Sequence, residues 1–93
     1  MDASPTLQFR LAKAKHDCIA RMQETADWLM CAPASDHDAL RLCGHRLAGT
    51  LGSFGFHEAA ALARELEQAC ETPAGRIGQA THKLANALRI LEV

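Results

Sequence analysis

The chain has 93 residues and a formal net charge of −1, from ten Lys and Arg against eleven Asp and Glu. This length is typical of one domain, and we expect a single domain over residues 1–93. A nucleic-acid-binding domain usually carries a basic excess, so the charge balance disfavours nucleic acid as a partner.

The composition predicts an all-α fold. Among the hydrophobic residues, 18 are Ala and 12 are Leu, and both are strong helix formers. Ile, Val and Thr total only nine residues, and Tyr is absent, so typical strand formers are scarce. The longest apolar runs are about six residues, far short of the ~20 that a membrane-spanning helix needs. The N-terminus does not resemble a signal peptide, so we expect a cytoplasmic protein.

The first predicted helix covers about residues 7–30. Pro33 ends it at or before Ala32. Phe9 falls outside the apolar stripe, either under a bent N-terminus or as an exposed contact, whereas Trp28 borders the stripe and is expected in the core. The stripe itself repeats every three or four residues and comprises Leu7, Leu11, Ala14, Cys18, Met22, Thr25 and Leu29.

Three further helices are predicted from about Asp36 to Ser53, His57 to Cys70 and Ala74 to Leu91. Ser35 is the expected N-cap of the second helix, and Gly55 is its expected left-handed C-cap glycine. Thr72 is the expected cap of the fourth. Each helix has one apolar stripe, and the connections are short enough to make neighbours antiparallel. Together these features predict an antiparallel up-down four-helix bundle.

Four of the six glycines, from Gly44 to Gly55, fall within twelve residues. A glycine inside a helix costs about 1 kcal/mol relative to Ala, so their presence in the second predicted helix needs a reason. On a helical wheel His45 lies about 180° from the centre of the apolar arc, and Gly49 and Gly52 are one and two turns further along its face. We therefore interpret the two glycines as clearance for a partner that must approach the imidazole of His45.

The segment from His45 to Gly55 resembles the signature of histidine-containing phosphotransfer (HPt) domains. The family pattern is His-x-Leu-Lys-Gly followed by a small residue, with another Gly ten residues after the His. Leu62–Glu67 in the third predicted helix also resembles the family. The residues that match the signature here are His45, Leu47, Gly49, Thr50 and Gly55.

The resemblance implies a helical bundle in which His45 takes a phosphoryl group from one receiver aspartate and passes it to another. It implies response-regulator receivers and a hybrid histidine kinase as partners, no kinase activity, and no cofactor in this chain, since Mg²⁺ belongs to the receiver. The family usually has Lys three residues after the His, where this chain has Ala48. Arg41, one turn before His45, is the better candidate to supply the missing charge, and Arg46 is the other.

Docking in this family is largely apolar around the His, so Leu42 and Ala48 are expected to contact a partner, joined by Phe9 if it is exposed. An alternative function is a helical adaptor that binds a receiver or another signalling partner without efficient transfer. A kinase dimerisation domain fits less well, because its His usually precedes an acidic residue and a proline. The starting Met and compact length favour a free-standing protein, and we expect a monomer.

A metal site is not expected. No Cys and His lie three or four residues apart, as ligands on one helix face would. The four Cys residues include no Cys-x-x-Cys pair and are expected to be reduced thiols used as small apolar residues.

Overall fold

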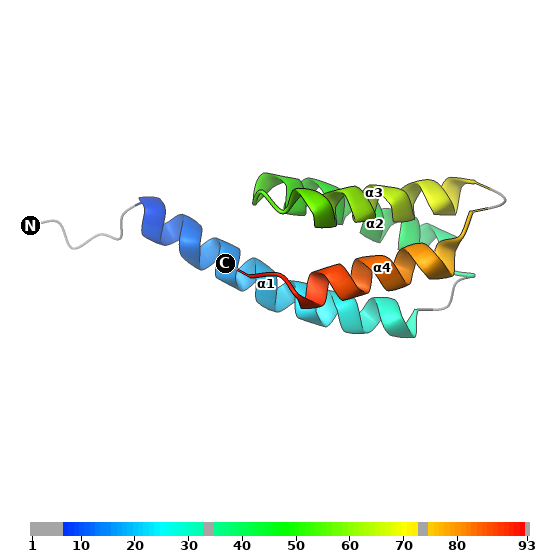
Figure 1. Cartoon of the computed structure of the whole chain (residues 1–93), viewed down its shortest axis with the longest axis horizontal. Coiled ribbons are helices and arrows are strands. Elements are labelled where there is room, and N and C mark those ends of the chain that lie inside the picture. The colour runs from blue at the N-terminus through cyan, green and yellow to red at the C-terminus, as the bar shows by residue number, and fades with distance from the viewer. Residues whose placement is uncertain (1–6, 33–34, 73–74, 93) are drawn as a thin grey trace, which may run out of the picture.

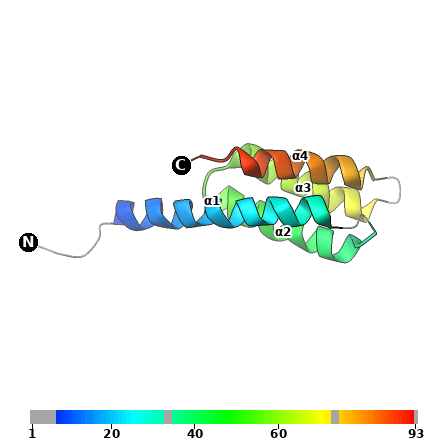
Figure 2. The same ribbon diagram turned by 90° about the horizontal axis from the view of Figure 1, so that it is seen from below.

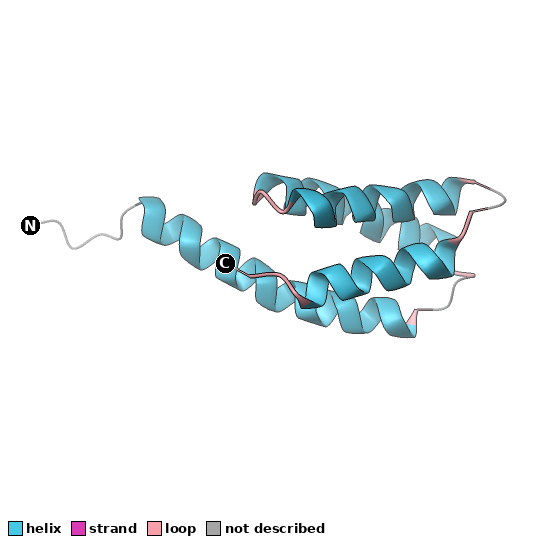
Figure 3. Cartoon of the chain, viewed as in Figure 1, coloured by secondary structure: helices cyan, strands magenta, loops and turns pink. Residues whose placement is uncertain are grey.

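The computed structural model describes residues 7–32, 35–72 and 75–92. These residues form four helices and no strand, which confirms the predicted all-α bundle (Figure 1; Figure 3). The helices are α1 (Leu7–Cys31), α2 (His37–Ser53), α3 (His57–Glu71) and α4 (Ile77–Arg89).

The ends of α2 are fixed by local hydrogen bonds. Its N-cap is Asp36, whose carboxylate accepts from the amide of Ala39, so the cap lies one residue later than the predicted Ser35. At the other end Gly55 has a φ of 83° and is the left-handed residue that the sequence predicts. The amide of Gly55 donates to the carbonyl of Gly52, and the next amide donates to Leu51, which is the Schellman arrangement. These hydrogen bonds complete the turn from α2 to α3 within three residues.

The fourth helix is shorter than predicted, because it begins at Ile77 and ends at Arg89. Thr72 does not cap it. The Thr72 hydroxyl donates instead to the carbonyl of Gln68, so it belongs to the end of α3, and the N-cap position of α4 is Arg76. The resulting α4 has 13 residues, whereas α1 has 25.

The core is made of buried apolar residues from all four helices. The helices pack in the order α1, α4, α3 and α2, with α2 and α3 in the most extensive contact. The backbones of α1 and α2 do not pack closely, and a groove runs between these two helices. The large side chains fully buried in the core are Leu29, Leu40, Leu51, Leu66, Leu84 and Leu88.

Helix α1 continues well past the end of the bundle (Figure 1; Figure 2). The molecule is consequently 59 Å long and only 19 Å across. Cys18, Met22 and Leu29 of the apolar stripe of α1 are buried, but Leu7 and Leu11 are 71% and 56% exposed. The prediction that these two leucines enter the core is wrong, because no other helix extends far enough to cover them.

Candidate functional site

His45 lies near the middle of α2 with its side chain 68% exposed. A Cβ added at Gly49 or Gly52 would meet no atom within 4 Å, apart from the chain neighbours and the backbone of its own helix turn. Packing against the described residues therefore requires neither glycine. The surface that follows His45 along α2 is therefore open, as the sequence predicts.

Gly44, which precedes His45, has the opposite environment. A Cβ at this position would lie 2.7 Å from the carbonyl oxygen of Ala63 and 3.0 Å from the amide nitrogen of Glu67. Both are backbone atoms of α3, and real Cβ contacts are almost never that short. The missing side chain of Gly44 therefore allows α2 to approach the backbone of α3 closely.

This close approach turns α2 toward α3. On the helical wheel of α2, the centre of the buried residues lies about 60° from the centre of the predicted apolar arc, toward Gly44 and Leu51. His45 is consequently at the α3 edge of the exposed face rather than directly opposite the core. An α3 side chain can reach it there.

That side chain is Glu67. Its Oε2 atom lies 2.8 Å from Nδ1 of His45. An ionised carboxylate can only accept a hydrogen bond, so Nδ1 of His45 carries the proton and donates. In the neutral imidazole the lone pair is then on Nε2, the nitrogen without a contact to Glu67. The arrangement fixes both the ring orientation and the tautomer, and it leaves one nitrogen able to act as a nucleophile.

Two arginines lie on opposite sides of His45. On the helical wheel Arg41 lies on the flank of α2 that faces α3, and its charge opposes the rise that burial causes in the pKa of the Cys70 thiol on α3. Burial likewise raises the pKa of the Cys43 thiol, with Arg46 opposing the shift on the side that faces α1. Both arginines are exposed and can attract an anionic partner from either side of the imidazole.

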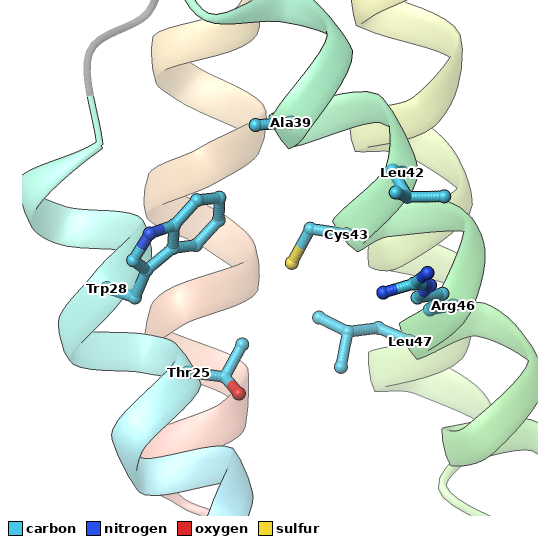
Figure 4. Close-up of a pocket in the computed structure, with 7 residues that line it drawn as sticks. All are labelled: Thr25, Trp28, Ala39, Leu42, Cys43, Arg46 and Leu47. Atoms are coloured by element: carbon cyan, nitrogen blue, oxygen red, sulfur yellow. The ribbon is translucent and has the colours of Figure 1, made fainter.

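The open side between α1 and α2 forms an apolar groove of about 400 Å³ (Figure 4). The indole of Trp28 on α1 forms one wall and side chains of α2 form the other. The Cys43 sulfur points from α2 into the groove. Trp28 is 43% exposed, so its predicted place in the core is wrong: α2 packs on α3 and leaves this side uncovered. The groove is lined by Thr25, Trp28, Ala39, Leu42, Cys43, Arg46 and Leu47.

A family model described as the Hpt domain matches residues 11–93. The chain belongs to the Hpt domain family. Hpt domains are phosphotransfer modules of phosphorelays and work with receiver domains and histidine kinases. No curated protein and no solved structure matches the chain significantly.

Two residues expected on the docking surface of this Hpt domain lie elsewhere. Ala48, where the family pattern has Lys, is only 9% exposed. It lies one helical turn after Gly44, on the side of α2 that packs inward, so its methyl group has little contact area to offer. Phe9 is exposed, but it precedes Lys15 by six residues, and Lys15 reaches the ring of Phe56 at the very end of the bundle. Phe9 is therefore far along the long axis from His45.

Glu67 is the site residue that the sequence reasoning did not single out. It belongs to the Leu62–Glu67 segment that resembles the family, but on α3 alone it looks like one of several solvent-facing acids. The sequence feature that could have pointed to Glu67 is Gly44. A glycine on the inward side of α2 indicates close helix packing, and close packing lets a carboxylate of the facing helix reach the residue after it.

The described residues contain no group of three His, Cys, Asp or Glu residues that could hold a metal ion. All four cysteines are free, and none of the helices is long and apolar enough to cross a membrane.

Proposed function

We propose that His45 accepts a phosphoryl group from the aspartyl phosphate of a receiver domain and passes it to the aspartate of another. The observation that carries this proposal is the exposed imidazole with Nδ1 held by Glu67 and open glycine positions beside it. The partners would be response-regulator receivers and a hybrid histidine kinase in the cytoplasm. Mg²⁺ would be held by the receiver, and this chain would contribute no kinase activity.

The transfer step follows from the tautomer. The Nε2 lone pair of His45 attacks phosphorus, an N–P bond forms, and the P–O bond to the receiver aspartate breaks. The aspartate leaves as a carboxylate, and the imidazole ring gains positive charge. Glu67 stabilises that charge through the Nδ1 proton, which stays on the ring. Transfer to the next receiver is the reverse of this step, so one arrangement serves both directions.

Clearance beside the ring matters because the donor is held inside another protein. The receiver must bring its phosphorus atom within about 3–3.5 Å of Nε2 along the line of attack. Gly49 and Gly52 leave that approach open. Arg41 and Arg46, both exposed, would attract the acidic site of a receiver, and Leu42 would extend the contact from His45 toward Trp28.

The second candidate is an adaptor that docks a receiver without efficient transfer. It is favoured by Ala48, because no cation stands at the position that follows His45 by three residues in the family pattern. In this case the groove and the arginines would bind the partner, and the imidazole would be a contact rather than a carrier.

One labelling experiment separates the two candidates. The chain is mixed with a receiver phosphorylated on its aspartate with radioactive phosphate, and label on the chain is tested for stability in acid and alkali. The carrier function predicts an acid-labile, alkali-stable label that His45→Gln abolishes and the control His16→Gln, another exposed histidine, retains. Binding of the receiver without any label would support the adaptor instead.

A further inference from the structure

The first half of α1 carries an apolar face that none of the other described residues covers. We call residues 7–17 of α1 the overhang. Leu7 and Leu11 are largely exposed on it, and Ala14 continues the line to Cys18, which is completely buried. Leu7 and Leu11 thus belong to the same apolar stripe that enters the core at Cys18, and they continue it toward the N-terminal end of α1.

The structure explains why cover is missing. The side-chain amide of Gln23 on α1 donates to the backbone carbonyls of Leu88 and Arg89, at N–O distances of 3.4 and 3.3 Å. The C-terminal end of α4 therefore lies level with Gln23. Helix α1 runs sixteen residues further, about 24 Å at 1.5 Å per residue. Ile90, the first residue after α4, is 78% exposed at this end. A helix that continued α4 would cover the overhang.

We propose that a second copy of this chain provides that helix, with the two overhangs packed antiparallel about a two-fold axis. Helix α4 runs antiparallel to α1, and so would the α1 of the second copy (Figure 1). Each overhang would therefore occupy the place of a longer α4 in the other copy, with Leu11 facing the Ala14 position. The same stripe supplies both sides, as a two-fold interface requires.

Charge on the overhang fits this pairing. Arg10 and Asp17 lie on the same flank of the stripe, about 20° apart on the helical wheel. In an antiparallel pair like flanks face each other, so Arg10 of each copy lies on the flank of Asp17 in the other, offset by two residues or about 3 Å along the axis, and two ion pairs form. The remaining cations do not oppose one another. Lys13 points away from the stripe, and Lys15 is held over the Phe56 ring of its own chain at 4.8 Å.

The proposed interface is small. Three helical turns from each copy bury less than the ~1,200 Å² that separates transient from stable complexes. We therefore expect a weak dimer that forms at high concentration, in place of the monomer expected from the sequence. His45 is far from the overhang along α2, so both copies keep an exposed imidazole.

Sedimentation equilibrium of the full chain under reducing conditions tests the proposal. Up to millimolar concentration, the weight-average mass should rise from 10.1 kDa toward twice that value. Leu11→Glu should weaken dimerisation at least tenfold with unchanged helicity, because Leu11 is exposed. Met30→Glu, at an exposed apolar residue on the other end of α1, should leave it unchanged. Arg10→Glu should weaken it roughly tenfold, and the double variant Arg10→Glu/Asp17→Arg should restore it.

A mass of one chain at every concentration would overturn the proposal. So would a dimer that Leu11→Glu leaves intact, or a charge swap that fails to restore association. If the chain stays monomeric while its overhang binds a receiver or anionic vesicles, and Leu11→Glu abolishes that binding, the occupant is that partner and the dimer is refuted.

Discussion

Replacing Gly44 with Ala tests whether close packing of α2 on α3 builds the site. A Cβ at Gly44 would meet two backbone atoms of α3, the carbonyl oxygen of Ala63 at 2.7 Å and the amide nitrogen of Glu67 at 3.0 Å. Neither atom can rotate away as a flexible side chain would. The helices must therefore move apart, and Glu67 moves with α3 away from His45.

The size of the effect follows from two opposing terms. Gly→Ala inside a helix stabilises by about 1 kcal/mol through propensity alone. Overpacking against a fixed backbone destabilises by about 1–3 kcal/mol. Gly49→Ala is the matched control, because it gains the same propensity and its Cβ meets nothing within 4 Å. The two variants should differ by about 1–3 kcal/mol in the free energy of unfolding.

Thermal unfolding followed by circular dichroism measures this difference. For a domain of this length, 1 kcal/mol corresponds to about 4–8 °C in Tm. We expect Gly49→Ala to unfold above the wild type and Gly44→Ala to unfold roughly 4–24 °C below Gly49→Ala. Equal upward shifts in Tm for the two variants would refute the account of how α2 and α3 pack.

Three further predictions concern transfer and docking. Glu67→Gln should slow phosphotransfer by about 10- to 100-fold in a rapid-quench assay, because a hydrogen bond to a charged group contributes about 1.5–3 kcal/mol; an unchanged rate would remove Glu67 from the mechanism. Gly49→Leu should lower the transfer rate by a similar factor by crowding the ring, without lowering Tm, and undiminished transfer would argue against the clearance role. Since burial raises the pKa of Cys43, its thiol stays protonated to higher pH, so peptide mass spectrometry should find slow alkylation at pH 8, accelerating as pH rises, and protection by a bound receiver. Rapid alkylation of Cys43 with the receiver bound would place the docking surface outside the groove.

Much of the fold was predictable, because local signals determine it. Proline and glycine mark the connections, and the left-handed Gly55 follows from its place directly after the apolar arc of α2. The orientation of α2 was not predictable in the same way. A helical wheel gives the apolar arc but not which neighbour packs most tightly, and that choice depends on the backbone contact at Gly44. The exposure of Trp28 follows from it.

The candidate site was predicted in part for the same reason. The exposure of His45 and the open surface at Gly49 are properties of one helix, and both can be predicted from a helical wheel. Glu67 comes from another helix, so its distance to His45 depends on how two helices meet. Ala48 illustrates the converse error, because a position about 60° from His45 on the wheel is buried once α2 turns toward α3.

The most direct test of the account is to determine which nitrogen of His45 carries the phosphoryl group. Phosphorylated chain labelled with ¹⁵N at histidine can be analysed by NMR, in which coupling to ³¹P identifies the bonded nitrogen. The contact between Nδ1 and Glu67 predicts phosphorylation at Nε2 of His45. Phosphorus bonded to Nδ1, or to any histidine other than His45, would contradict it.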